Sequence, residues 1–222
     1  EIPLSFDLSI LVPFSPECQL SGVSRQLKPG EYLWYRRTIP LAKPQQDKRI
    51  LLHFGAADQT AEVFVNRISA VRHCGGYLPF SADITDYLQE GDNELIVRIQ
   101  DESNTSWHAR GKQSLKPGGM FYTAQSGLWQ TVWMEAVHPE GLQSVQLLTD
   151  IDQQQLVVRP RFYKELGGKL QVTVKDNGKI VASQTITASS LSSAILPIKK
   201  MKTWSPENPF LYDLEYKVID KN

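Results

Sequence analysis

The sequence predicts an all-β protein built as two antiparallel sandwiches. Short alternating runs of apolar and polar residues, bounded by Gly, Pro, Asn and Asp, dominate the chain, and helical periodicity is nearly absent. Parallel sheets need crossover helices, which this pattern does not provide, so the strands should pair antiparallel. With 222 residues the chain has the length of one large or two small domains.

The first half contains clear strand patterns. In the run 93–101, Leu95, Val97 and Ile99 alternate onto one face, and Gly91-Asp92 supplies a turn just before them. The strands expected in this half are 49–55, 62–66, 93–101 and 130–137.

A domain boundary is expected where Pro139 and Gly141 interrupt the chain, giving domains 1–138 and 139–222. Asp176-Asn177-Gly178 separates two strand patterns and is a strong hairpin signal. A strand-rich region of about 80 residues suits an immunoglobulin-like sandwich. Its expected strands are 143–149, 156–163, 169–175, 180–187 and 211–219.

Composition excludes several classes of protein. Lys plus Arg equals Asp plus Glu, so the basic excess typical of nucleic-acid binders is absent. No apolar run approaches the roughly 20 residues of a membrane span, and no basic-then-apolar signal layout is present. The four histidines show no metal-ligand spacing, so we expect neither a metal nor another cofactor.

The two cysteines, Cys18 and Cys74, are far apart and form no CxxC motif. We expect free thiols, which favours the cytoplasm, with a secreted or periplasmic location as the alternative.

The segment Asn66–Thr85, NRISAVRHCGGYLPFSADIT, combines a turn residue, Gly-Gly and several aromatics. It resembles the sugar-binding jelly-roll domain of glycoside hydrolase family 2, the family of β-galactosidases, β-glucuronidases and β-mannosidases. Its members show an Asn, then Val, His, Gly-Gly-Tyr, Pro-Phe and Asp-Ile-Thr in this order. The resemblance continues in order through 34–37, 51–56, 91–95 and 126–133, and ends with the run 204–212, WSPENPFLY, similar to the family's immunoglobulin-like domain.

The resemblance implies a galactose-binding-like jelly roll over 1–138 and an immunoglobulin-like sandwich over 139–222. The chain would be the non-catalytic N-terminal part of a retaining hydrolase of terminal β-linked sugars, with no catalytic residue of its own. Its partners would be a carbohydrate substrate and the family's TIM barrel, with oligomerisation left open. A free-standing carbohydrate-binding module and an adhesion-type sandwich are the alternatives.

No carboxylate pair is placed to flank a sugar bond. Retaining hydrolysis needs two carboxyl groups about 5–5.5 Å apart. Asp101 and Glu102 are neighbours, so on a strand they point to opposite faces. Glu135 lies in an apolar strand and is expected to face solvent.

The long loop 103–126 is the most promising site for a sugar. It concentrates donors and aromatics, and aromatic faces with polar neighbours are typical of sugar sites. Phe121 stands where many family members carry an Asp that reaches the substrate. This departure weakens assignment as a standard β-galactosidase or β-glucuronidase. The alternative role of Phe121 and Tyr122 is to pack the loop. The residues expected to contact substrate are Arg110, Lys112, Gln113 and Tyr122.

Glu17 lies in the segment 12–23, which resembles the entry loop of a subset of bacterial members. It is expected either to touch substrate or to form a salt bridge with the barrel. Elsewhere, Trp129 and Trp133 should share a buried face, and His73 should form loop hydrogen bonds.

The chain ends where a strand pattern is still running, and 220–222 resembles the start of a hairpin turn. We therefore expect a fragment whose last sandwich strand is missing.

Overall fold

The computed structural model describes residues 1–41, 47–165 and 167–219, and it is nearly all β. The chain divides into two compact units, Glu1–Val137 and His138–Asn222. Within the described residues the helices are three single turns, η1 (Gln19–Ser21), η2 (Thr85–Tyr87) and η3 (Ser103–Thr105). None of them is long and apolar enough to cross a membrane. The prediction of an all-β sandwich fold is confirmed.

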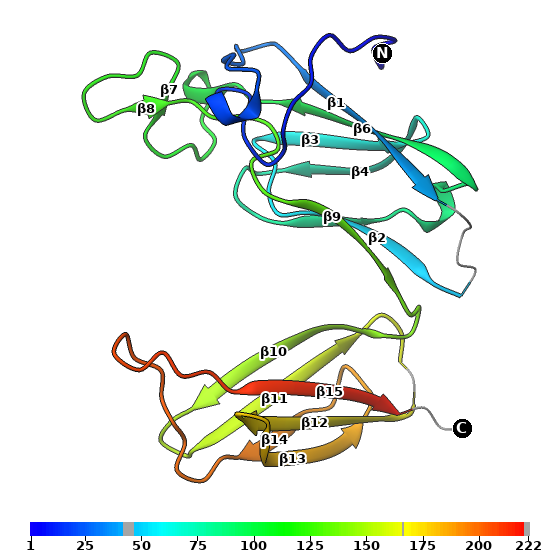
Figure 1. Ribbon diagram of the computed structural model, residues 1–222, viewed down its shortest axis with the longest axis vertical. Coiled ribbons are helices and arrows are strands. Elements are labelled where there is room, and N and C mark those ends of the chain that lie inside the picture. The colour runs from blue at the N-terminus through cyan, green and yellow to red at the C-terminus, as the bar shows by residue number, and fades with distance from the viewer. Residues whose placement is uncertain (42–46, 166, 220–222) are drawn as a thin grey trace. The chain divides into compact units, whose positions relative to one another are not determined.

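Two antiparallel sheets face each other in the first unit (Figure 1). Apolar side chains alternate inward from both, so that Leu52 and Phe54 meet Val63, Val65 and Ile99 in one core. Burying a side chain of this kind stabilises the fold by about 1.5–3 kcal/mol. One sheet has the order β1 (Leu33–Leu41), β6 (Gly91–Gln100), β3 (Thr60–Val65), β4 (Ile68–Cys74); the other has β5 (Phe80–Asp83), β2 (Arg49–Phe54), β9 (Val132–Val137).

The hairpin between β3 and β4 explains why the apolar run stops at Asn66. Asn66 and Arg67 have φ of 49° and 67°, the left-handed conformation that a tight hairpin turn needs. The side-chain amide of Asn66 also bridges two segments: its Nδ2 donates to the Tyr87 carbonyl at 2.8 Å, and its Oδ1 accepts from the backbone amide of Glu94 at 2.9 Å. A single turn residue therefore joins three segments of the unit.

A row of side chains crosses the outer face of the four-stranded sheet. Trp34, Arg98, Glu62 and Arg72 are direct cross-strand partners on β1, β6, β3 and β4. Glu62 is only 4% exposed, and it accepts from Arg98 at 2.7 Å and from Arg72 at 2.8 Å. Burial alone would raise the pKa of Glu62, but hydrogen bonds from Arg72 and Ser69 and the charges of both arginines lower it.

The second unit is also a sandwich of two sheets (Figure 1). The predicted turn at Asn177 and Gly178 is confirmed, with φ of 48° and 81°. β14 escaped sequence analysis because it is only four residues long and ends at Pro197. The sheets have the orders β10 (Leu142–Asp150), β11 (Gln155–Phe162), β14 (Ala194–Pro197) and β13 (Lys179–Thr187), β12 (Lys169–Asp176), β15 (Asp213–Ile219).

The expectation that Trp129 and Trp133 share a buried face is wrong. β9 begins at Val132, so Trp129 precedes the strand, and its Nε1 donates to the Gly76 carbonyl at 2.8 Å. Trp133 is 47% exposed and stacks on His53 with ring centroids 4.0 Å apart. The rule of spacing by four applies only when both residues belong to the same regular strand.

Two further expectations concern single sites. The His73 ring hydrogen-bonds the Gly75 carbonyl at 3.0 Å, as predicted, and it also stacks on Phe80. The predicted turn at 220–222 lies outside the described residues.

Replacing Glu62 with Gln should lower the free energy of unfolding by about 1–3 kcal/mol, because hydrogen bonds from two guanidinium groups lose their charged acceptor. Since the pKa of Glu62 is lowered in the fold, its contribution should be present at neutral pH and disappear on acidification through that pKa. Urea denaturation at pH 7 and at acid pH measures both effects. Glu90→Gln, at an exposed position, is the control; equal losses in the two variants would contradict the prediction.

Candidate functional site

The loop 103–126 projects from one end of the first unit, between β6 and β9. Figure 1 shows its two short strands, β7 (Gln113–Ser114) and β8 (Tyr122–Thr123), extending beyond the main sheets. The Tyr122 amide donates to the Lys112 carbonyl at 2.9 Å, and the Leu115 amide donates to Asn104 Oδ1 at 3.0 Å. The loop therefore has internal structure of its own.

The structure separates the four predicted loop contacts into two groups. Arg110 donates to the Ser106 carbonyl at 2.8 Å, and Gln113 Oε1 accepts from the Gln125 amide at 2.5 Å, so both of these side chains hold the loop together. Lys112 is exposed, and Tyr122 is 70% exposed. Lys112 and Tyr122 are thus the more exposed of the four residues, and substrate contact by all four stays a prediction.

Exposed aromatic rings accompany Tyr122 on the same loop. Trp107 is 95% exposed and Phe121 is 49% exposed. A ring that folding leaves in water is a surface on which the apolar face of a sugar can stack. Phe121 can offer such a face, but it offers no acceptor for a hydroxyl group.

Glu17 fastens the entry loop to the base of the long loop. Its carboxylate accepts from the Ser126 hydroxyl at 2.6 Å, from the Ser126 amide at 3.1 Å and from the Leu27 amide at 3.2 Å. A carboxylate engaged by three donors of its own chain has little capacity left for a sugar hydroxyl. Contact between Glu17 and substrate, or between Glu17 and a barrel, is not tested by this arrangement and stays a prediction.

Sequence analysis missed Asp58, which is only 5% exposed. Burial, followed by the charge of Asp101, raises the pKa of Asp58 to about 7; a hydrogen bond from Gln113 opposes this shift and the charge of Glu17 adds to it. Its Oδ1 has no hydrogen-bond partner among the described residues. The signal in the sequence was an acidic residue between Ala56-Ala57 and an alternating strand, where an apolar environment is expected.

Asp101 and Glu102 both serve the loop structurally. Asp101 accepts from the Ser103 amide at 2.7 Å and contacts His108 at 3.2 Å, and both side chains of that pair are buried. Burial raises the pKa of Asp101 although the Ser103 amide and His108 oppose the shift. Glu102 accepts from the Gly30 amide at 3.2 Å. The two carboxylates are thus committed to different partners.

The base of the loop is closed by a pair of reciprocal backbone hydrogen bonds. The Asp58 amide donates to the Gly127 carbonyl at 2.9 Å, and the Gly127 amide donates back at 2.8 Å. Gly127 has φ of 79°, and a Cβ there would collide with the Tyr35 hydroxyl, so only glycine fits. Gly76 is similarly constrained, because its Cβ would run into the Asp58 carboxylate.

Metal binding finds no support in the part of the chain that the structure describes. No group of three or more His, Cys, Asp or Glu side chains in these residues could hold a metal ion. Both cysteines are free, with Cys74 exposed and Cys18 half-buried.

The chain thus combines two all-β sandwiches with an aromatic-rich loop at one end of the first. Two family models match it: "Glycosyl hydrolases family 2, sugar binding domain" over residues 24–157 and "Glycosyl hydrolases family 2" over residues 143–222. The chain belongs to glycosyl hydrolase family 2.

Curated relatives are much longer than this chain. A β-galactosidase of Thermoanaerobacter pseudethanolicus is 27% identical over 85% of the chain, which spans 26% of that protein. A β-galactosidase of Bacteroides ovatus is 25% identical over 98% of the chain, which again spans 26% of the relative. In both relatives, the region that matches this chain is therefore only one part of a longer protein.

Solved structures share the fold. A β-glucuronidase of Ruminococcus gnavus superposes with a TM-score of 0.77 at 24% identity, covering 99% of this chain and 38% of that one. A β-glucuronidase of Dictyoglomus thermophilum gives a TM-score of 0.72 at 24% identity, with 95% and 38% covered.

We expect Asp58→Asn to stabilise the protein at pH 8 and to flatten its pH dependence. The pKa of Asp58 rises from 3.8 in the unfolded chain to about 7 in the fold, so between pH 3.8 and about 7 the folded state binds a proton that the unfolded state has lost. Stability should then fall as pH rises through this window, by at most about 1.4 kcal/mol per pH unit, and level off above it. Thermal midpoints from pH 4 to 8 measure the slope. Asp86→Asn, at an exposed position, is the control; a slope unchanged by Asp58→Asn would contradict the prediction.

Gly127→Ala should destabilise the first unit by about 2–4 kcal/mol, since it adds a collision to a left-handed backbone. Gly30 is the matched control, because its φ of 80° is nearly the same and nothing lies within 4 Å of a Cβ placed there. Gly30→Ala should cost only about 1–2 kcal/mol. Denaturant unfolding of both variants measures the difference, and equal losses would show that the collision with Tyr35 is unimportant.

Proposed function

We propose that this chain is the non-catalytic N-terminal part of a retaining glycoside hydrolase that removes terminal β-linked sugars. One observation carries the proposal: two models of the same hydrolase family follow each other along the chain, yet the chain spans only about a quarter of the β-galactosidases it matches. The curated relatives carry the names β-galactosidase and β-glucuronidase, which supports a β-glycosidic bond as the bond that is cleaved.

The carboxylates of the chain support a non-catalytic role for it. A retaining mechanism needs one carboxyl group as a nucleophile and a second as an acid and base across the same bond. At the base of the loop, Glu17 and Asp101 accept hydrogen bonds from backbone amides, and Asp58 is buried. Such groups are held for structure, so the reacting pair is proposed to come from the family's barrel in the rest of the protein.

The proposed role of the loop is to form one wall of the substrate pocket. Tyr122 and Lys112, the more exposed pair, would contact the sugar. Arg110 and Gln113 hold the loop in shape through one atom each and stay proposed as further contacts. Phe121 replaces the acceptor that many family members place here, so we propose a substrate whose hydroxyl groups do not depend on that acceptor. The mechanism requires no metal or other cofactor.

The proposed partners are a carbohydrate substrate and the barrel of the same protein, and an oligomer is compatible with this role. We propose a cytoplasmic location, because two free thiols persist best in a reducing compartment.

The chain alone should be inactive, whereas the protein encoded by its complete reading frame should hydrolyse an aryl β-glycoside. Both forms are to be assayed against aryl β-galactoside, β-glucuronide and β-mannoside. Turnover by the purified 222-residue chain would overturn the non-catalytic assignment. A complete reading frame without a barrel would instead identify a free-standing carbohydrate-binding module.

In the complete enzyme, Tyr122→Ala should raise KM or lower kcat by about tenfold, the value of one lost stacking or hydrogen-bonding contact. The thermal midpoint should stay nearly unchanged because Tyr122 is 70% exposed. Ile68→Ala is the control, since Ile68 is 57% exposed and pairs with Val65 at the far end of β3 from Asp58. Loss of stability with unchanged kinetics would show that the loop merely packs.

A further inference from the structure

A hydrogen-bond network joins the carboxyl of Asp58 to both arms of the long loop. On the outgoing arm, the Gln113 side chain donates to this carboxyl, and its Oε1 accepts from the Gln125 amide of the returning arm. The Ser15 hydroxyl of the entry loop donates to Gln125 Oε1. The backbone of Asp58 exchanges hydrogen bonds with Gly127 at 2.9 and 2.8 Å. One side chain therefore lies where the two ends of the loop meet.

Two other carboxylates are placed beside Asp58 by its backbone surroundings. Asp101 directly follows the residue whose carbonyl accepts from the Gln59 amide at 3.3 Å. Glu17 accepts from Ser126, which precedes the backbone partner of Asp58. Both carboxylates act on Asp58 as like charges.

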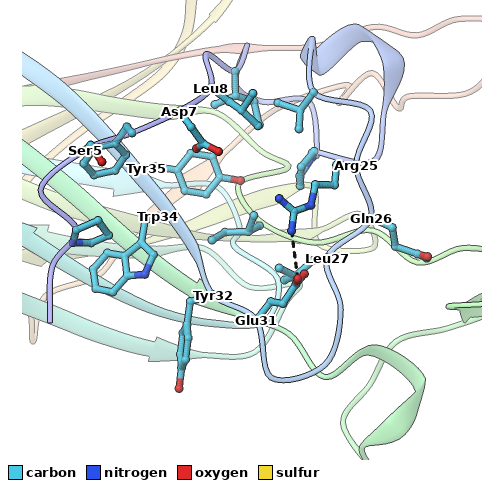
Figure 2. A pocket seen from close by; sticks show the side chains of 16 residues that line it. Ser5, Asp7, Leu8, Arg25, Gln26, Leu27, Glu31, Tyr32, Trp34 and Tyr35 are labelled. Atoms are coloured by element: carbon cyan, nitrogen blue, oxygen red, sulfur yellow. Dashed lines mark hydrogen bonds and ion pairs between the residues drawn. The ribbon is translucent and has the colours of Figure 1, made fainter.

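The other titratable groups at this point leave Asp58 without a counter-charge. His108 is paired with Asp101 at 3.2 Å. Tyr35, which also lines the cavity shown in Figure 2, would touch a Cβ at Gly127 with its hydroxyl. Burial raises the pKa of Tyr35 to about 12, so this hydroxyl stays neutral over the physiological range.

The cations of the loop are engaged elsewhere or exposed. Arg110 donates to the Ser106 carbonyl at 2.8 Å, and Lys112 and Lys116 occupy exposed positions. Asp58 forms no ion pair in the part of the chain that the structure describes.

Ionisation of Asp58 would therefore place an uncompensated charge inside the base of the loop. The residue is only 5% exposed, and its Oδ1 has no hydrogen-bond partner among the described residues. A buried charge in such a place is unfavourable, whereas a protonated carboxyl carries no charge and can itself donate a hydrogen bond. Opening the loop would remove Gln113 and Gly127 from around the carboxyl and let water reach it.

We propose that Asp58 is a pH-dependent latch for the long loop: its protonated side chain holds both arms closed, and loss of the proton releases them. Only the loop opens, because local opening needs less free energy than unfolding of the whole unit. The proposal rests on the proposed function, in which this loop forms one wall of the substrate pocket, and it adds regulation of that wall. In the complete enzyme the wall would be ordered in a mildly acidic medium and loosened above neutral pH.

The direction of the effect follows from the pKa of Asp58 in the two states of the loop. With a pKa of about 7 in the closed loop and 3.8 in water, the closed state holds a proton that the open state has lost between these values. The equilibrium constant for opening then rises by at most about tenfold per pH unit in this window and is constant above it.

Hydrogen exchange of the 222-residue chain, followed by NMR between pH 5 and pH 8, tests the latch. The protection factors of the Gln125 and Gly127 amides should fall by about tenfold or more over this range. Low urea should have little influence on this fall, because local opening exposes little surface. Amides of β12, in the second unit, are the control and should show no such fall.

Three variants separate the latch from a purely structural role of Asp58. Asp58→Asn removes the titration, so both amides should be as protected at pH 8 as at pH 5. Asp86→Asn, at an exposed position, should behave as the unchanged chain. Glu17→Gln should move the midpoint of the fall to lower pH, since it removes one like charge. Thermal midpoints show whether each variant is folded; if Asp58→Asn is not, the profile of the unchanged chain and Glu17→Gln decide.

The latch is wrong if protection of the two amides changes by less than about threefold, or if the fall persists in Asp58→Asn. It is also wrong if these amides lose protection only together with those of the β3–β6 ladder, since the whole unit would then be unfolding. In the complete enzyme, KM should rise above pH 7 relative to Asp58→Asn. An unchanged KM beside a confirmed latch would overturn the role of the loop in the pocket, and not the latch, because the exchange measurements use the chain alone.

Discussion

The reciprocal backbone hydrogen bonds between Asp58 and Gly127 are the constraint that closes the base of the loop 103–126. They join the segment before β3 to the segment before β9, which are 69 residues apart in the sequence. The close approach is open only to glycine at position 127, where the Tyr35 hydroxyl occupies the space of a side chain. The entry loop joins the same point, because Glu17 accepts from the amide and hydroxyl of Ser126.

This closure also creates an electrostatic cost. It places the buried carboxyl of Asp58 near those of Asp101 and Glu17, and desolvation together with like charges holds the pKa of Asp58 near 7. On the outer sheet face the cost of burying a carboxylate is compensated: Glu62 is as buried as Asp58, but it forms ion pairs with two arginines. The pKa values of the two carboxylates therefore shift in opposite directions.

The row of Trp34, Arg98, Glu62 and Arg72 links the four strands of the outer sheet face through contacts between neighbouring side chains. The Arg98 guanidinium contacts both of its cross-strand neighbours: it donates to Glu62 at 2.7 Å and lies 5.8 Å from the Trp34 ring centroid. In the loop 103–126 the exposed rings have fewer supports: Trp107 and Tyr122 lie largely in water. The first unit thus offers one ordered aromatic surface at β1 and one exposed aromatic surface on the loop.

The sequence by itself determined many of the strands and turns, because these depend on local rules, but it did not predict β1, β4, β5 or β14. Alternation of Leu95, Val97 and Ile99 defined a strand, and Asn177-Gly178 defined a hairpin, since the left-handed conformation favours these residue types. It also identified the loop 103–126 and its aromatic content. Only the tertiary structure decided which side chains are free. All four loop residues look like equal candidates in the sequence, but hydrogen bonds within the loop engage Arg110 Nη1 and Gln113 Oε1. The burial of Asp58 was invisible for the same reason: burial and paired charges arise from segments that meet only in the folded chain.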